Sequence, residues 1–245
     1  PLLLEEVLKN KKSDIYHIYI STSFLSYKRL SKKFGFFIRN QYPFCISLKD
    51  WFNFFMMHLN KIFFSFINRN PKNIKEYLNR KGFNCSYIKE INSNSFYEKL
   101  RSQNPDLFFF ACFDKIASEE FCKIPNLGTY NIHLGKLPGY KGGLSSFWVL
   151  RFQDKTAGAS IHKVTKEIDS GELIAEITFN ADLKSMHLLM LKTVKISSKL
   201  INNTINNIFQ NKKIKINIKE RSSNYFLFPS KKDFKEFYKK GCRLI

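Results

Sequence analysis

Short apolar segments alternate with helix-periodic ones from residue 85 onward, and this alternation limits the fold more than any other feature. The clearest strand signal is Leu107–Ala111, an unbroken apolar run typical of a buried parallel strand. Strands that alternate with helices indicate an α/β fold with a mostly parallel sheet, whose sites lie at the carboxyl ends of the strands. The expected strands are 15–21, 85–88, 107–111, 129–132, 157–164 and 172–179, and the expected helices are 95–103, 145–152 and 185–209.

Basic residues are concentrated on both sides of a neutral central region. The 245-residue chain has 41 Lys and Arg against 20 Asp and Glu, a net charge of +21. Residues 28–81 carry a charge of +10 and residues 211–245 a charge of +8, whereas residues 82–180 are neutral. We interpret 28–81 as a basic helical insertion that ends at a Gly82 cap, and 211–245 as a basic aromatic C-terminal extension. Both are candidates for contact with a partner, with solvated helix faces as an even alternative.

The cysteines and the apolar segments indicate a cytoplasmic location. The five cysteines are odd in number and never spaced as C-x-x-C, which favours reduced thiols. No secretion signal follows Pro1. The segment 51–67 has 17 residues and several polar interruptions, so it is too short and too polar to cross a bilayer. It is imperfectly amphipathic, and we interpret it as a core helix or as a membrane-surface contact.

Several familiar catalytic motifs are absent from the sequence, and three others remain. No G-x-G-x-x-G follows a strand, and no P-loop, H-E-x-x-H or G-x-S-x-G occurs, so nicotinamide, P-loop and metalloprotease functions have no support. The remaining motifs are Asn131-Ile132-His133 at a strand end, the run 137–143, and Ile168-Asp169-Ser170-Gly171.

These motifs carry groups that suit acyl transfer to an amine. Asn131 and His133 are two residues apart in a strand, so their side chains point to the same side. Asn131 can donate to an oxyanion, His133 can stabilise it or move protons, and Asp169 can keep His133 cationic by charge pairing. On spacing alone the structural interpretation is favoured, namely a buried core histidine and two ordinary turns.

The motifs together, in this order, resemble the formyltetrahydrofolate-dependent formyltransferase family over residues 104–176. The family's Asn-x-His, its Leu-Pro-x-Tyr-Lys-Gly loop and its x-Asp-x-Gly turn stand here as 131–133, 137–142 and 168–171. The 36-residue separation of His133 and Asp169 also fits the family. The segment Leu134-Gly135-Lys136 differs from the Pro-Ser-Leu found in several members. The difference leaves the three catalytic residues intact, but the identity of the amine acceptor stays open.

The resemblance implies a Rossmann-like catalytic domain over residues 1–210, with 28–81 inserted in it and 211–245 following it. The family's first strand precedes the part that matches residues 1–9, so we expect that central strand to be missing. The resemblance also implies formyltetrahydrofolate as donor, no metal, and catalytic roles for Asn131, His133 and Asp169. The folate-binding residues that it implies are Phe113, Asp114, Lys115, Ile116, Ala117, Thr165 and Ile168.

The leading hypothesis is transfer of a formyl group from the folate to a primary amine, in methionyl-tRNA or an amino sugar nucleotide. Hydrolysis, with water as acceptor, uses the same trio and is the first alternative. A degenerate, basic module that binds RNA or a membrane surface is the second. His162, which lies in the expected strand 157–164, is interpreted as structural.

Overall fold

The structure is a computed structural model that describes residues 17–21, 74–113, 115–212 and 222–245. Three expectations concern other residues: the opening helix, most of the basic insertion, and the role of Asp114. They lie outside the described residues.

The larger sheet is formed, in spatial order, by β3 (Phe108–Ala111), β4 (Thr129–His133), β6 (Thr156–Lys163) and β7 (Leu173–Asn180). β3 and β4 are parallel, whereas β6 is antiparallel to both of its neighbours. The connection between β6 and β7 is too short for a parallel crossover, which needs a dozen or more residues. The two strands therefore pair as a hairpin.

Two shorter strand pairs accompany this sheet: β1 (Ile18–Ser21) with β2 (Cys85–Ile88), and β5 (Lys141–Gly142) with β8 (Tyr225–Phe226). Both are parallel, so three of the five strand pairings among the described residues are parallel. The expected α/β fold with mostly parallel pairing is confirmed, although the larger sheet is mixed. Within the described ranges no pairing joins β1 or β2 to that sheet.

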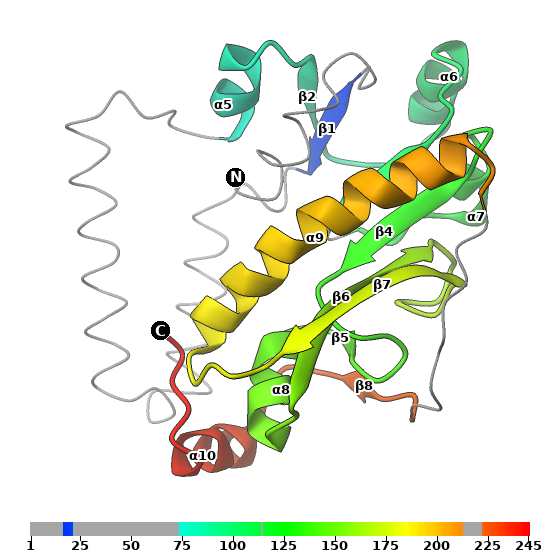
Figure 1. The fold of residues 1–245 in the computed structure, drawn as a ribbon. Helices are drawn as coiled ribbons and strands as arrows, with labels where there is room; N and C mark the ends of the chain where they lie inside the picture. Colours follow the sequence, from blue (N-terminus) through cyan, green and yellow to red (C-terminus); the bar gives the residue numbers. More distant parts are fainter. Residues whose placement is uncertain (1–16, 22–73, 114, 213–221) are drawn as a thin grey trace.

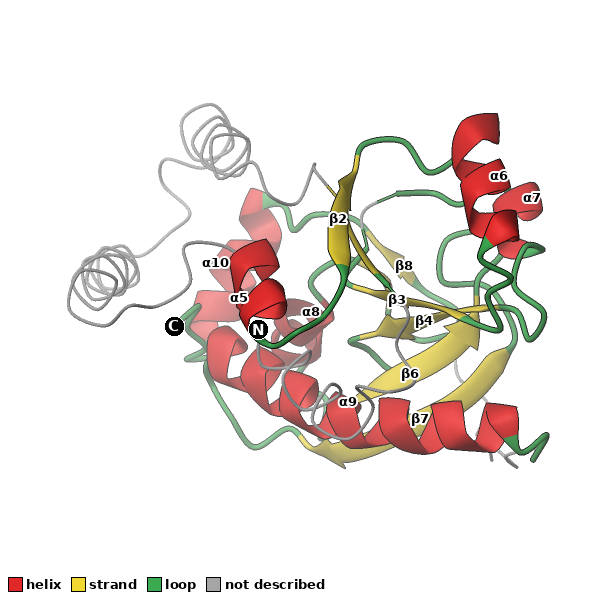
Figure 2. Cartoon of the chain, turned by 90° about the horizontal axis from the view of Figure 1, so that it is seen from above, coloured by secondary structure: helices red, strands yellow, loops and turns green. Residues whose placement is uncertain are grey.

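Six helices are described, and the longest lies across the larger sheet (Figure 1). They are α5 (Ile74–Arg80), α6 (Asn94–Ser102), α7 (Glu119–Cys122), α8 (Ser145–Phe152), α9 (Met186–Phe209) and α10 (Lys231–Lys239). α9 is the long helix, and α6 and α7 lie together beside the sheet (Figure 2). Gly82 follows α5 with φ +79°, a conformation that suits glycine, so the expected helix end is confirmed. None of the described helices is long and apolar enough to cross a membrane.

Side-chain alternation separates an apolar from a polar face where β4 and β6 pair. Ile132 pairs with Ile161, and both are buried in the core that includes Ile201 of α9. Asn131 pairs with His162 in the same register. Because successive strand residues point to opposite faces, this polar pair lies on the face turned away from α9.

The C-terminal residues pack against α8. The rings of Phe147 in α8 and Phe237 in α10 are stacked with centroids 4.6 Å apart. Arg151 Nη2 of α8 lies 2.5 Å from Oε2 of Glu236 in α10. Ser230 begins α10 with a capping box, which satisfies amides at the helix start. The expected domain boundary at residue 210 stays a prediction.

Candidate active site

Four polar side chains meet on the sheet face turned away from α9. Asn131 and His133 come from β4, His162 from β6, and Asp169 from the loop between β6 and β7. Oδ2 of Asp169 lies 3.4 Å from Nδ1 of His133, and Oδ1 lies 3.5 Å from Nε2 of His162. Nδ2 of Asn131 lies 3.1 Å from the same Nε2. The structure thus brings the expected trio together, with a second histidine between the amide and the carboxylate.

His162 is the cluster member that the sequence analysis set aside as structural. It is 3% exposed, and its pairing partner on β4 is Asn131. Directly opposed residues of antiparallel strands share a face, with Cβ atoms about 4.5–5.5 Å apart. The sequence indicates the strand but not the register, and the register is what brings this imidazole to the site.

Asp169 is held on a loop with an uncommon backbone conformation. Its φ is +52°, in the left-handed region where aspartate is enriched among non-glycine residues. Its Oδ2 accepts a hydrogen bond of 2.8 Å from the amide of Gly142, and its side chain is 10% exposed. Next to it, Lys141 Nζ donates to Ser170 Oγ at 3.0 Å. The carboxylate is therefore fixed by β5 on one side and by the histidines on the other, and such local strain is frequent at functional sites.

Both ring nitrogens of His133 face protein groups. Nδ1 faces Asp169, while Nε2 lies 2.5 Å from the carbonyl oxygen of Tyr140 and 3.4 Å from Oγ of Ser145. Because a carbonyl oxygen can only accept, Nε2 carries a hydrogen and donates it to Tyr140. Nδ1 is then the nitrogen that gains or loses a proton, and it faces the carboxylate.

Gly135 leaves space for a hydroxyl group beside the imidazole of His133. A Cβ at residue 135 would lie 2.6 Å from Ser145 Oγ and 2.8 Å from His133 Nε2, so a side chain does not fit. The segment 134–136, which differs from the Pro-Ser-Leu of several family members, therefore leaves room for the buried Ser145 beside the ring. Ser145 is a further site residue, and no pattern in the sequence marks it.

Burial controls the charge of His133. It lowers the pKa of the imidazole below the ordinary value of 6.5, and the opposing effects of the Asp169 charge and the Tyr140 carbonyl do not overcome it. Burial thus opposes the expected charge pairing, and the expectation that Asp169 keeps His133 cationic stays a prediction.

Asp169 stays ionised in the same surroundings. Burial by itself would raise the pKa of this carboxyl, but the hydrogen bond to His162, the attraction to His133 and the Gly142 amide together lower it below the ordinary 3.8. The cluster therefore combines one carboxylate with a buried imidazole whose Nδ1 faces it. Among the described residues, no group of three or more His, Cys, Asp or Glu side chains is arranged as a metal site.

The two loops expected to hold a folate border one aromatic cluster. Phe113 follows β3, Val164 follows β6, and both pack against the cluster that contains Phe121. Asp114 lies outside the described residues. The fold therefore places the two loops at one common core, while the residue contacts to a folate stay a prediction.

The expected folate-binding residues differ in how accessible they are. Ile116 and Ile168 are 61% and 48% exposed, and both are large apolar side chains that a ring system could cover. Ala117 is buried and offers only main-chain groups. Lys115 is half-buried, and the exposed Thr165 donates its hydroxyl to the carbonyl of Glu167.

Comparisons with known proteins agree with this geometry. A family model described as formyl transferase matches residues 68–196, more than half of the chain. The chain is 32% identical over 167 residues to the bifunctional polymyxin resistance protein ArnA of Wigglesworthia glossinidia brevipalpis, covering 68% of this chain and 24% of that protein. It is 30% identical over 132 residues to methionyl-tRNA formyltransferase of Thermotoga neapolitana, covering 54% of this chain and 42% of that protein. It thus spans less than half of either relative.

A solved structure shares the fold. Glycinamide ribonucleotide transformylase 1 from Symbiobacterium toebii matches with a TM-score of 0.51 and 19% sequence identity. The match covers 56% of this chain and 68% of that one. At this identity the likeness shows the fold alone.

Proposed function

The chain belongs to the formyl transferase family, and we propose that it transfers a formyl group from formyltetrahydrofolate to a primary amine. The main observation in support is the cluster of an amide, two imidazoles and a carboxylate on one sheet face. Acyl transfer to an amine needs a hydrogen-bond donor for the oxyanion and a group that accepts the proton of the amine. The cluster supplies both, and all four residues lie within the matched range.

Asn131 is the proposed donor to the oxyanion. Nε2 of His162 lies 3.1 Å from Nδ2 of Asn131 and 3.5 Å from Oδ1 of Asp169, while Nδ1 of His162 lies 2.8 Å from the carbonyl oxygen of Lys163. The contact with His162 fixes the plane of the Asn131 amide. A hydrogen of that amide then serves the oxygen of the tetrahedral intermediate, and one such donor typically contributes about two to three orders of magnitude in rate.

His133 and Asp169 are the proposed proton acceptors. A proton taken up at Nδ1 of His133 would lie between the imidazole and the carboxylate, whose charge stabilises the imidazolium. The amine nitrogen forms a bond to the formyl carbon, and the bond from that carbon to the folate nitrogen then breaks. The proton passes to the departing folate nitrogen, which leaves as tetrahydrofolate.

Methionyl-tRNA and amino sugar nucleotides are the proposed acceptors. Both present a primary amine on a molecule that carries phosphate, and the net charge of +21 favours anionic partners. The similarity to methionyl-tRNA formyltransferase of Thermotoga neapolitana supports the first of them. Methionyl-tRNA is therefore the first acceptor to test.

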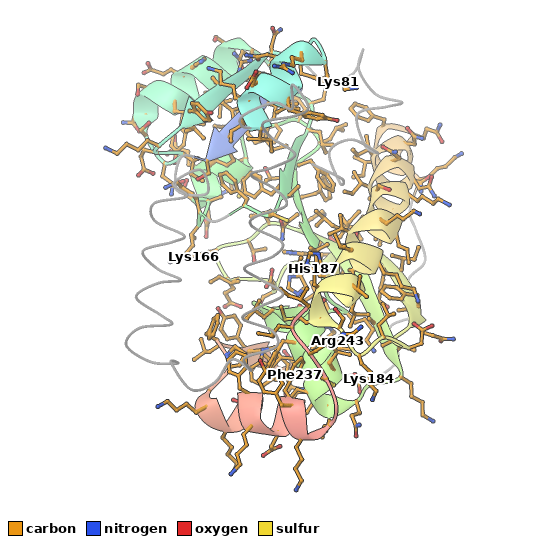
Figure 3. The ribbon with its side chains drawn as sticks, turned by 90° about the vertical axis from the view of Figure 1, so that its left-hand side faces the viewer. Lys81, Lys166, Lys184, His187, Phe237 and Arg243 are labelled. Atoms are coloured by element: carbon orange, nitrogen blue, oxygen red, sulfur yellow. The ribbon has the colours of Figure 1, made fainter. Side chains whose placement is uncertain are left out.

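The test follows tetrahydrofolate release from formyltetrahydrofolate in the presence of methionyl-tRNA, of amino sugar nucleotides, or of buffer alone. Release that depends on an amine supports the proposal, and release in buffer alone identifies hydrolysis instead. His133→Ala should abolish release, whereas His187→Ala, on α9 (Figure 3), should leave it unchanged. A folded protein that releases nothing with any acceptor contradicts the proposal, and salt-dependent RNA binding would then favour the degenerate module.

A further inference from the structure

The C-terminal segment 222–228 contacts the loop that supports the catalytic cluster. We propose that this segment, through β8 and the Phe226 side chain, positions residues 138–143 so that they can bond to His133 and Asp169. The inference rests on the proposed function, and it adds a part of the chain that lies far from the motifs in sequence. Figure 1 shows β5 and β8 side by side at one end of the larger sheet.

Two main-chain groups of residues 138–143 reach the cluster. The amide of Gly142 donates to Oδ2 of Asp169 at 2.8 Å, and the carbonyl of Tyr140 accepts from Nε2 of His133 at 2.5 Å. Because both groups belong to the backbone, the path of the loop decides whether these bonds form. An element that fixes this path therefore fixes the ring of His133 and the carboxylate of Asp169.

β8 fixes the path of the loop through hydrogen bonds. The amides on either side of Gly142 point away from Asp169 and toward the C-terminal segment, as parallel strand pairing requires. Gly142 has φ +88°, and a Cβ there would collide with the carbonyl oxygen of Phe226, so the two strands approach closely only with glycine. The bonds run from Lys141 N to Asn224 O (3.0 Å), from Gly143 N to Phe226 O (3.3 Å) and from Asn224 N to Pro138 O (3.3 Å).

Phe226 is the side chain that holds β8 against the rest of the molecule. Its ring is stacked on Trp148 of α8 with centroids 4.8 Å apart, and it lies 5.6 Å from the ring of Tyr140. Its neighbours Tyr225 and Leu227 are 52% and 73% exposed. Among residues 225–227, Phe226 is therefore the one whose side chain packs against the rest of the molecule.

The residues after the segment are also anchored to α8. Arg151 Nη2 pairs with Glu236 at 2.5 Å, and Lys240 Nζ donates to the carbonyl of Arg151 at 2.7 Å. Phe234 lies with its ring 5.0 Å from that of Phe147. The segment is therefore held from its C-terminal side, and β8 is a fixed support.

The kinetic test compares three variants of the full chain. Phe226→Ala removes the packing of β8, Phe226→Leu keeps an apolar side chain, and Tyr225→Ala is the matched control on the exposed side of the same strand. We expect kcat to fall on the order of 10²-fold in Phe226→Ala, since displacing a site by about 1 Å can cost that much. The KM for the folate should change little, because the folate loops do not include 138–143. Phe226→Leu should recover most of the activity, and Tyr225→Ala should match the wild type.

A second measurement does not depend on turnover. The ring signals of ¹⁵N-labelled histidines are recorded by NMR and assigned with His133→Gln and His162→Gln. Phe226→Ala should shift the His133 signals, Phe226→Leu should give an intermediate shift, and Tyr225→Ala should give none. Unshifted His133 signals in folded Phe226→Ala overturn the inference, whatever happens to kcat.

The two proposals can fail separately. A wild-type protein without turnover contradicts the proposed function, while the ring signals still test the role of β8. If circular dichroism shows that Phe226→Ala is unfolded, Phe226→Leu decides: a shift of the His133 signals supports the inference, and no shift overturns it.

Discussion

The strands on either side of β4, β3 and β6, line the same face of the sheet with different kinds of side chain. On the β3 side this face is aromatic, and the ring of Phe108 lies 5.0 Å from that of Phe121. On the β6 side it is polar, and His162 lies directly opposite Asn131. The parallel neighbour contributes to a continuous apolar core, whereas the antiparallel neighbour sets polar side chains face to face within hydrogen-bond reach. We infer that the β6 side governs the chemistry and the β3 side the stability.

The largest effect is expected for Asp169→Asn, which removes the charge that bridges the two histidines. Turnover should fall by about two to three orders of magnitude, because the amide can neither accept a proton nor stabilise an imidazolium. The measurement is kcat for tetrahydrofolate release. Asp182→Asn changes an exposed carboxylate paired with Lys192 and should leave kcat unchanged. Equal losses of kcat in Asp169→Asn and Asp182→Asn would contradict a special role of the β6 side in the chemistry.

A smaller loss is expected for His162→Ala, because it frees the Asn131 amide without removing it. We expect kcat to fall about 10- to 100-fold through misplacement of the oxyanion donor. His17→Ala removes a histidine that bonds instead to Ser86 between β1 and β2, and it serves as the control. An unaltered kcat in His162→Ala would return this residue to the structural role that the sequence indicated.

On the β3 side, Phe121→Leu should reduce stability and leave chemistry intact. Phe121 is 5% exposed and its ring contacts several other aromatic rings. A swap of similar volume in such a core typically costs about 1 kcal/mol in the free energy of unfolding, which urea denaturation measures. A drop in kcat without loss of stability would show that the aromatic side also takes part in the chemistry.

The smallest expected effect is a loss of stability when the pH is lowered. The folded protein lowers the pKa of His133, so below the ordinary value of 6.5 the unfolded chain binds a proton more readily than the folded one. Stability should therefore fall as the pH drops from 7.5 to 5.5, whereas the contribution from the lowered pKa of Asp169 is lost only below about its ordinary 3.8. Urea denaturation at both pH values should show a smaller loss for His133→Gln. The same loss in both proteins would contradict the lowered pKa of His133.

Much of the local structure was open to prediction from the sequence. The strand 85–88 and the helix 145–152 have the expected bounds, and Gly82 ends α5 as expected. Each depends on residues close together in the chain, whose periodicity or missing Cβ carries the signal. The short strands β5 and β8 are additions to the expected elements, since two paired residues leave no periodic pattern to detect. The helix α10 is also an addition, although Ser230 and Asp233 have the spacing of a capping box that marks a helix start.

The sequence by itself determined which groups could react: an amide and an imidazole two residues apart on one strand, and a carboxylate in a later turn. Tertiary structure decided how they are used. It set the antiparallel register that adds His162, the burial that lowers the pKa of His133, and the support that β8 gives to the loop at Gly142. The physical reason is that periodicity depends on neighbours in the chain, whereas register, burial and loop position are sums of contacts between residues far apart in sequence.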